Sequence, residues 1–400
     1  MVANPMRRAG EYVRQPGGFQ AFIPASLPPH PPMRVDDDLL VILSQADRSL
    51  GRLDGSIEVL PNPDLFLYMY IRKEAVLSSQ IEGTQASLID VLEYEAEALQ
   101  SGYAHDVFEV MNYVNALNYG VDRLESLPLS LRLIREIHGK LLAGVRGGER
   151  NPGEFRKTQN WIGPPGCTLE TATFVPPPVP DMRAALANLE TFLHQEISMP
   201  ILIRVGLAHA QFETVHPFLD GNGRMGRLLI TLLLVERGVL RRPLLYLSYY
   251  FKKNRLEYYD RLQAVRDRGD WEGWLKFFLR GVHEVAQEAT EVARNIVNLH
   301  EEHRELVIKQ MGRGAGKGLM LLEALYQAPV TSVHRVADIT RLSFANANAL
   351  VKQLVALNLL TEVTGRKRNR VFTYSPYLDL FNDPLTGTPT MEAHQEPQPS

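Results

Sequence analysis

The sequence predicts a mainly α-helical protein that combines a helical bundle, one β-hairpin and a small C-terminal winged helix-turn-helix domain. Three observations carry this prediction. Apolar residues recur at helical spacing from Asp36 to about residue 310, and one Gly/Pro-rich stretch interrupts them. Three short helical patterns and two short strand patterns then follow. With 400 residues, 45% of them hydrophobic, the chain is long enough for two or three domains.

Composition narrows the class of protein before any motif is considered. The formal net charge of −3 gives no global attraction to nucleic acid or to anionic membranes. The single cysteine, Cys167, excludes an internal disulfide framework and a CxxC-type zinc site. No stretch reaches the roughly 18 to 20 apolar residues of a membrane span, and the N-terminus lacks the apolar core of a signal peptide. We therefore expect a cytoplasmic protein without a membrane partner.

Composition and periodicity divide the chain into five segments. They are a Pro-rich arm, a group of N-terminal helices, a larger helical domain, a small basic domain and a polar tail, over residues 1–35, 36–100, 101–310, 317–376 and 384–400. The arm is expected to be extended over another surface or disordered, and the tail to be disordered. A Gly-rich break from Met311 to Gly316 predicts a hinge and a domain boundary.

Periodicity places the individual elements. Helices of the larger domain are expected at about 105–126, 129–143, 181–197, 200–214, 223–237, 253–266 and 270–309. Aromatic and β-branched residues flank a Gly/Pro cluster between Phe155 and Pro178, which predicts a hairpin. The small domain is expected to have helices at 319–326, 333–339 and 345–357 and strands at 360–363 and 370–374.

The segment from His216 to Arg227 concentrates the side chains that favour phosphate chemistry. A buried helix is predicted to begin near Asn222, so Gly221, Asn222 and Gly223 lie at a helix N-terminus, where free N–H groups attract anions. The segment also supplies a carboxylate for Mg²⁺, an imidazole suited to accepting a proton, and two guanidinium groups on the first turn. These are Asp220, His216, Arg224 and Arg227. The pattern predicts a triphosphate site.

Two other interpretations of this segment are weaker. Gly221, Gly223 and Gly226 match the GxGxxG fingerprint of dinucleotide-binding folds, but that fingerprint follows a strand, and here a helix precedes it. A simple helix start with solvated arginines would explain the glycines and the arginines. It would not explain His216, Asp220 and Asn222 together.

The segment resembles the signature of the Fic family, His-x-Phe-x-(Asp/Glu)-Gly-Asn-Gly-Arg-x-x-Arg, at every fixed position. The resemblance covers about residues 36–300 and implies a Fic-type helical bundle whose hairpin is the substrate-docking flap. It implies transfer of AMP from ATP to a Ser, Thr or Tyr hydroxyl of a target protein, with release of pyrophosphate. His216 would be the catalytic base and Asp220 the Mg²⁺ ligand. The implied ATP contacts are Asp220, Gly221, Asn222, Gly223, Arg224, Gly226, Arg227, Tyr258, Tyr259, Ile162 and Gly163.

One position of the signature separates branches of the family. A branch resembling the Doc toxin has Lys where this chain has Gly223, and it phosphorylates its target instead. Gly223 therefore favours AMP transfer. For Tyr258 and Tyr259 an ordinary role as helix aromatics stays open, as does transfer of UMP or phosphocholine.

Residues 78–83 resemble a second family element, the inhibitory (Ser/Thr)-x-x-x-Glu-(Gly/Asn) motif, with Ser78, Glu82 and Gly83 at its constrained positions. By that resemblance Glu82 pairs with Arg227 and removes the guanidinium that should receive the γ-phosphate. Some relatives use this glutamate to remove AMP from the modified target, and the sequence leaves that role open. If Glu82 were only a solvated helix charge, its replacement would be neutral.

The small C-terminal domain is basic. Residues 317–376 contain eight basic and three acidic residues, a net charge of +5, and four of the basic residues lie in the wing between Arg366 and Arg370. The expected recognition helix carries Asn346 and Asn348. DNA is therefore a candidate partner, and protein docking or dimerisation is the alternative. The runner-up function is a transcription regulator that senses nucleotide through the Fic fold.

The remaining partner predictions follow from the resemblance. We expect a target protein, with the chain itself as a candidate target, and a homodimer. His300 and His303 are three residues apart and lack a third ligand, so we interpret them as part of a solvated helix face.

Overall fold

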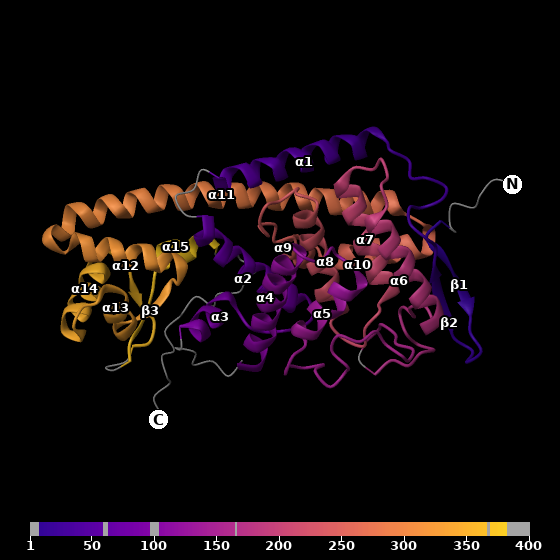
Figure 1. The fold of residues 1–400 in the computed structure, drawn as a ribbon, viewed down its shortest axis with the longest axis horizontal. Coiled ribbons are helices and arrows are strands. Elements are labelled where there is room, and N and C mark those ends of the chain that lie inside the picture. Colours follow the sequence, from indigo (N-terminus) through magenta and orange to yellow (C-terminus); the bar gives the residue numbers. More distant parts are fainter. Residues whose placement is uncertain (1–7, 59–62, 97–103, 165, 366–368, 382–400) are drawn as a thin grey trace, which may run out of the picture. The chain divides into compact units, whose positions relative to one another are not determined.

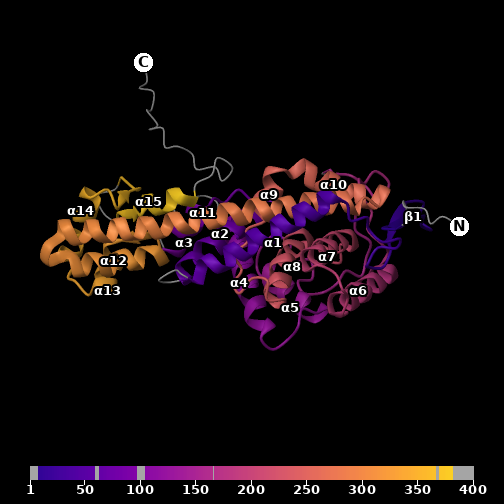
Figure 2. The same ribbon diagram turned by 90° about the horizontal axis from the view of Figure 1, so that it is seen from above.

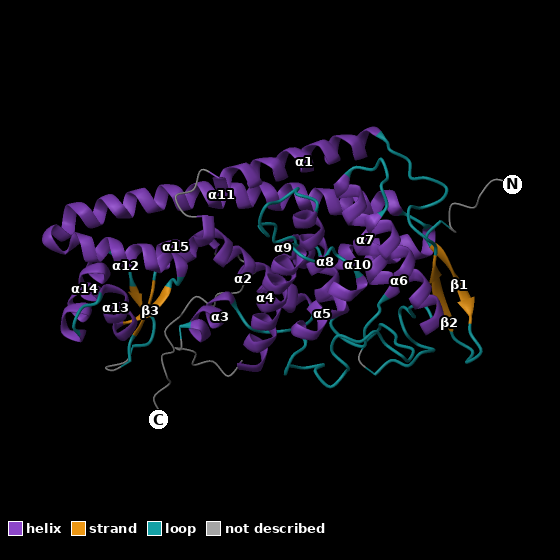
Figure 3. Cartoon of the chain, viewed as in Figure 1, coloured by secondary structure: helices purple, strands orange, loops and turns teal. Residues whose placement is uncertain are grey.

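The computed structural model describes residues 8–58, 63–96, 104–164, 166–365 and 369–381 (Figure 1). The protein is mainly helical, as predicted, and contains two small antiparallel sheets among these residues (Figure 3). Contacts divide the chain into two units, residues 1–84 with 108–291 and residues 85–107 with 292–400. The division falls within one long helix, before the Gly-rich segment where the sequence predicted a boundary. That segment forms a short 3-10 turn, Gly312–Gly314, followed directly by a helix.

Unit 1 is built around two central helices. These are α7 (Ile201–Val215) and α8 (Asn222–Glu236), and all residues of α7 from Leu202 to Val215 are buried. They pack on each other and on α2 (Pro63–Ile81), α5 (Leu131–Leu141), α6 (Val179–His194) and α10 (Arg255–Arg268). Both central helices are apolar on nearly every face, which explains why neighbours surround them. The loop that joins them carries the signature.

The other helices of unit 1 close this core. α4 (Ala104–Leu124) and α11 (Trp271–Met311) contribute residues to both units, and α9 (Ser248–Lys253) is a short helix that the sequence did not predict. Figures 1 and 2 show α1 (Asp37–Glu58) running alongside the first half of α11. Ser49 Oγ and His283 Nδ1 lie 2.8 Å apart across this contact. Among the described residues no helix has the length and apolar character that crossing a membrane requires.

The N-terminal arm contains a hairpin that the sequence analysis missed. β1 (Gly10–Arg14) pairs with β2 (Gln20–Pro24) in antiparallel register, with Gly10 opposite Pro24. Its Phe22 N–H donates to the carbonyl of Val175 over 3.0 Å. The proline content predicted an arm that is extended over another surface or disordered; the described part is extended and contacts Val175, but the pairing of its two strands was not predicted. Residues 1–7 lie outside the described residues.

The predicted flap hairpin is shorter than expected. Between Phe155 and Pro178 the two sides are joined by one antiparallel bridge, Ile162 with Phe174, whose two hydrogen bonds measure 2.8 and 3.0 Å. Pro164, Pro176 and Pro177 have no N–H to donate, so the ladder cannot continue past the bridge. The flap is therefore an irregular loop with one backbone bridge among its described residues, and side-chain hydrogen bonds such as Gln159 Nε2 to the Pro176 carbonyl over 2.8 Å also join its two sides.

Unit 2 contains α3 (Leu88–Glu95) and the C-terminal elements. These are α12 (Ala315–Gln327), β3 (Val330–Ser332), α13 (Val333–Thr340), α14 (Phe344–Ala356), β4 (Thr361–Glu362), β5 (Val371–Thr373) and α15 (Ser375–Leu378). The strands form a sheet in the order β3-β5-β4, and the sequence did not predict β3. Ser332 and Ser343 cap α13 and α14 by accepting backbone hydrogen bonds.

Two other expectations fall in this unit. His300 and His303 do not form a solvated face, because they contact Glu323 at 2.7 Å and the Tyr374 hydroxyl at 2.5 Å. The basic wing residues 366–368 and the tail 384–400 lie outside the described residues.

Candidate active site

The loop between α7 and α8 is held by the side chains of Asn222 and His138. Phe218 N–H donates to Asn222 Oδ1 over 2.8 Å, and Asn222 Nδ2 donates to the Phe218 carbonyl over 2.9 Å. The buried ring of Phe218 stacks on His138 with a centroid distance of 3.6 Å. His138 Nε2 lies 2.9 Å from the Asp220 carbonyl, and its Nδ1 accepts a hydrogen bond from Gly153 N–H. The side chain of Asn222, predicted to hold phosphate, is therefore used to close the loop.

His216 ends α7 and lies at the entrance to this loop. It adopts the left-handed backbone conformation, with φ of 47°, which turns the chain sharply out of the helix. Its carbonyl accepts hydrogen bonds from Arg156 Nε over 3.0 Å and from Asn160 Nδ2 over 3.2 Å. Its ring Nδ1 has no hydrogen-bond partner in the described structure. Burial, and next the charge of Arg266, lower the pKa of the imidazole to about 4, so it is neutral and can accept a proton.

Gly221 and Gly223 shape the N-terminus of α8. Gly221 caps the helix in the left-handed conformation, with φ of 73°. Gly223 allows Glu82 to approach, because a Cβ atom there would lie 2.2 Å from Glu82 Oε1. A carboxylate therefore already lies beside the helix N-terminus, where an anion is favoured.

Arg227 makes three hydrogen bonds to the predicted inhibitory segment. Its Nε donates to Ser78 Oγ over 2.8 Å, and its Nη2 donates to the Ser78 carbonyl over 2.9 Å and to Glu82 Oε1 over 2.7 Å. Burial alone would raise the pKa of the Glu82 carboxyl, but the charge and the hydrogen bond of Arg227 hold it below its usual value. The guanidinium is 2% exposed and the Glu82 side chain 33%. The pair thus has one buried and one accessible member.

The inhibitory segment ends in a tight turn. Glu82 N–H and Thr84 N–H both donate to the Ser79 carbonyl, over 3.0 and 3.2 Å. Gly83 between them has φ of 100°, which a residue with a side chain rarely adopts. This turn reverses the chain at the end of α2 and leaves the Glu82 carboxylate beside α8.

Arg224 has weaker contacts than Arg227. Its Nη1 donates to Glu109 Oε2 over 3.3 Å, and its Nη2 lies 3.8 Å from Asp220 Oδ1. Its Nε is buried and has no partner in the described structure. The residue is 1% exposed. A buried guanidinium with long contacts and an unused N–H donor can donate further hydrogen bonds to oxygen atoms.

Asp220 fits a magnesium ligand. Its Oδ1 accepts from Gly221 N–H over 2.6 Å, while its Oδ2 lies 3.9 Å from Arg150 Nη1. Gly147 leaves room for the carboxylate, since a Cβ there would lie 2.8 Å from Oδ2. The described residues contain no group of three or more His, Cys, Asp or Glu side chains that could hold a metal alone. A single carboxylate completed by phosphate oxygens and water is the usual Mg²⁺ arrangement at nucleotides.

Gly226 and the two tyrosines lie around Glu213 and His209. A Cβ at Gly226 would lie 2.2 Å from Glu213 Oε1, so this glycine packs against the carboxyl of Glu213 rather than facing open space. Tyr258 is 1% exposed and its hydroxyl lies 2.9 Å from His209 Nε2, as the alternative interpretation of a core aromatic requires. Tyr259 is 42% exposed and remains able to contact a nucleotide.

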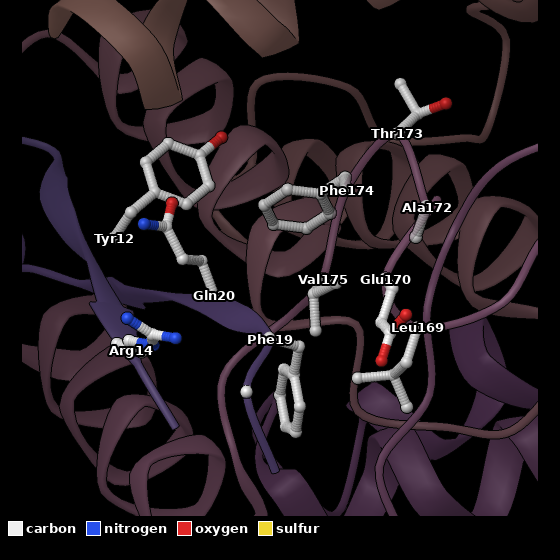
Figure 4. Close-up of a pocket in the computed structure, with 11 residues that line it drawn as sticks. Tyr12, Arg14, Phe19, Gln20, Leu169, Glu170, Ala172, Thr173, Phe174 and Val175 are labelled. Carbon is white, nitrogen blue, oxygen red and sulfur yellow. The ribbon is translucent and has the colours of Figure 1, made fainter. Parts of the chain in front are cut away.

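Ile162 and Gly163 lie on the flap and not in the loop. Ile162 forms the bridge to Phe174, and Gly163 lies against Cys167, whose Sγ would be 2.7 Å from a Cβ at position 163. Between the flap and the N-terminal hairpin lies a pocket of about 440 Å³ (Figure 4). Its lining includes Tyr12, Phe19 and Gln20 on one side and residues 169–170 and 172–175 on the other. No motif or pattern in the sequence predicted this pocket.

Several residues of the site were missed by the sequence analysis. They are His138, which holds the loop, Glu109, which contacts Arg224, Arg266, whose charge lowers the pKa of His216, and Glu213, which lies against Gly226. Burial raises the pKa of Glu213 to about 7, although the charge of Arg227 opposes the shift. Glu213 lies on α7 only three residues before His216, so its helix position was a signal. Glu109 had no such signal, because its partner Arg224 is distant in sequence.

Comparison with known proteins agrees with this geometry. Residues 40–122 match the model described as Fic/DOC family N-terminal, and residues 128–234 match the model of the Fic/DOC family. The chain is 31% identical over 169 residues to a protein adenylyltransferase Fic of Drosophila grimshawi, covering 42% of this chain and 30% of the relative. It is 30% identical over 178 residues to a probable protein adenylyltransferase of Aquifex aeolicus, covering 44% and 51%. The chain thus spans 30% and 51% of the lengths of these two curated relatives.

One solved structure extends the likeness in fold. A Fic family protein from Desulfovibrio desulfuricans G20 superimposes with a TM-score of 0.56 at 17% identity, over 86% of this chain and 97% of that one. It shows that the helical architecture is shared. The two matched segments confirm the predicted resemblance: residues 40–122 and 128–234 contain the N-terminal domain and the Fic domain of the Fic/DOC family.

Proposed function

We propose that this protein is a protein adenylyltransferase that transfers AMP from ATP to a Ser, Thr or Tyr hydroxyl of a target protein. We further propose that Glu82 restrains this activity by pairing with Arg227. The observation that supports the activity most is the neutral His216 imidazole, with an unpartnered ring nitrogen, at the entrance to a helix N-terminus that carries two arginines. The names of the curated relatives point to the same activity.

The chemical step follows from this arrangement. His216 accepts the proton of the target hydroxyl while the hydroxyl oxygen attacks the α-phosphorus of ATP. The bond between the α-phosphorus and the bridging oxygen breaks, and pyrophosphate leaves. The backbone N–H groups of Asn222 and Gly223 and the guanidinium of Arg224 stabilise the charge on the phosphate oxygens. Asp220 would hold Mg²⁺, which would supply positive charge to the phosphates.

The proposed restraint has an electrostatic basis. Ser78 and Glu82 take the Nε and Nη2 donors of Arg227, so the edge of the guanidinium that these two nitrogens form is not available to a γ-phosphate. The carboxylate also lies beside Gly223, where it repels phosphate oxygens. Because the Glu82 side chain is one-third exposed, it can leave without unfolding the core. Removal of AMP from the target by the same glutamate is an alternative role.

The experiment follows label from ATP. Purified Glu82→Gly protein and the double variant Glu82→Gly/His216→Ala are incubated with Mg²⁺, cell lysate and ATP labelled at the α- or the γ-phosphate. Label from the α position alone, lost with His216, is expected. Label from γ would mean a kinase. No label from either would favour another donor, such as UMP or phosphocholine, or the nucleotide-sensing regulator.

The same assay tests two partner predictions. A lane without lysate reports self-modification, since label would then appear on the enzyme itself. Light scattering of the purified chain tests the homodimer, whose expected mass is twice the 45.1 kDa of one chain. The flap, with Ile162 and Gly163, is the surface where we propose that an extended segment of the target docks.

We also propose that the C-terminal part of unit 2 is a winged helix-turn-helix module that binds DNA. The three helices α12 to α14 and the sheet β3-β5-β4, whose strand β3 lies between α12 and α13, favour this module. Asn346 is exposed near the start of α14, and Arg370 donates to Asn348 Oδ1 over 2.7 Å. Fluorescence anisotropy with random-sequence duplex DNA tests the module. Binding that weakens steeply with salt is expected, and no binding at 50 mM salt would contradict it.

A further inference from the structure

Glu109, on α4, is a buried carboxylate that no motif includes. It is 4% exposed, and three groups reach it. Arg224 Nη1 and Thr84 Oγ1 both donate to its Oε2, over 3.3 and 3.1 Å, while Arg146 Nε lies 3.4 Å from its Oε1. A buried carboxylate with this many donors fixes the groups around it.

The two ends of the Arg224 guanidinium face different carboxylates. Nη1 contacts Glu109 on one side, and Nη2 lies toward Asp220 at the N-terminus of α8 on the other. Its Nε has no partner in the described structure. Without Glu109, Asp220 would be the nearest acid, and the guanidinium would turn onto the carboxylate that we propose for Mg²⁺. Glu109 therefore sets which edge of Arg224 is available.

Thr84 connects this contact to the inhibitory turn. Its N–H closes the turn on Ser79, while its hydroxyl shares Glu109 Oε2 with Arg224. The turn thus touches both signature arginines, Arg227 through Glu82 and Arg224 through Thr84 and Glu109.

We propose that Glu109 is a positioning residue for nucleotide binding, which holds Arg224 by Nη1 so that its Nη2 donor is available to the β-phosphate. This inference rests on the proposed ATP site. It predicts selectivity for nucleotides that have a β-phosphate, because the contribution of Arg224 is absent for AMP.

The test measures nucleotide binding with the full chain in the Glu82→Gly background. Isothermal titration gives Kd for Mg²⁺ with ATP, ADP and AMP. Glu109→Gln is expected to weaken ATP and ADP about tenfold and to change AMP less than twofold, as expected for loss of one charge-assisted contact. Glu136→Gln is the matched control, since Glu136 is also shared by two arginines, Arg123 and Arg132. It should leave all three Kd values unchanged.

A double-variant cycle separates positioning from a general structural role. Once Arg224→Ala is present, adding Glu109→Gln should change the Kd of ATP less than twofold. Equal weakening of ATP and AMP, or full additivity with Arg224→Ala, would overturn the proposal. If Glu109→Gln does not fold, Glu109→Asp replaces it, with a severalfold loss of ATP affinity expected and none for AMP.

Transfer of label is measured on the same samples, which separates the two proposals. Glu82→Gly protein that binds ATP but transfers no AMP would contradict the proposed function and leave the Glu109 comparison intact. Active protein whose ATP to AMP affinity ratio is unchanged by Glu109→Gln would contradict only the positioning role. No ATP binding by Glu82→Gly would overturn both.

Discussion

The two signature arginines lie one turn apart on α8, yet their surroundings differ. Arg227 makes three hydrogen bonds of 2.7 to 2.9 Å to Ser78 and Glu82, whereas Arg224 makes one of 3.3 Å to Glu109 and leaves Nε without a partner in the described structure. The Arg227 side of the site is thus occupied by the chain itself, whereas the buried Arg224 keeps donors that its neighbours use only weakly. The difference fits our proposal that restraint acts through Arg227.

The partners also differ in how easily they can leave. Glu82 is one-third exposed and follows a helix end, while the Glu109 side chain is 5% exposed in the middle of α4. A carboxylate at a turn can move away at the cost of one ion pair, but Glu109 cannot move without disturbing its helix. We therefore expect Glu82 to be the mobile partner and Glu109 the fixed one.

Replacing Glu82 should give the largest effect. Glu82→Gly frees Arg227 for phosphate, and we expect AMP transfer to rise on the order of 100-fold, within the usual range of coupling energies. Initial rates with α-labelled ATP measure it, and Glu82→Ala is the control for the added flexibility of glycine. Equal or lower incorporation would show that Glu82 is not a restraint.

Replacing each arginine in turn should show which of the two sides of the site contributes more to the stability of the protein. Arg227→Ala breaks three short contacts and leaves Glu82 beside α8, so the free energy of unfolding should fall by about 2 kcal/mol, discounted because Glu82 is partly exposed. Arg224→Ala leaves Glu109 with Arg146 and Thr84 and should cost about 1 kcal/mol. Urea unfolding of both variants gives the comparison. A larger loss for Arg224→Ala would reverse our assignment of the occupied side.

The effect of Gly223→Ala on stability should change sign when Glu82 is replaced. A Cβ at position 223 would lie 2.2 Å from Glu82 Oε1, so the wild-type background should lose about 1 kcal/mol of stability as Glu82 is displaced. In the Glu82→Gly background that clash is gone, and alanine in a helix should instead gain up to about 0.5 kcal/mol. Thermal unfolding of the four proteins closes the cycle. Destabilisation in both backgrounds would mean that Glu82 does not occupy this space.

The pH dependence of kcat/KM should show the smallest change. A pKa of about 4 means that His216 stays neutral, and therefore competent as a base, until the pH falls toward 4. Between pH 7.5 and 5.5 the Glu82→Gly enzyme should lose less than about a tenth of its kcat/KM, whereas an imidazole with an ordinary pKa near 6.5 would be about nine-tenths protonated at pH 5.5. A tenfold fall over this range would contradict the neutral base.

The helices were predictable because helical periodicity is local. Each expected helix from residue 105 to 309 has a counterpart within a few residues, since apolar spacing of three and four residues directly reports a buried face. Short elements were not predictable in this way. α9, β3 and the hairpin β1–β2 are too short to establish a period, and tertiary contacts such as Phe22 with Val175 stabilise them.

The residues of the site divide in the same way, into features that a local pattern predicts and contacts that only tertiary packing creates. The sequence alone determined which residue types stand on the loop and the first turn of α8, and hence the expectation of phosphate chemistry, because their spacing along one short segment fixes where they lie. Only the tertiary structure decided their partners. It used Asn222 to close the loop, buried Tyr258 against His209, and brought Glu109 to Arg224 across 115 residues of chain. Pairing between distant segments depends on how whole helices pack, and no local pattern records it.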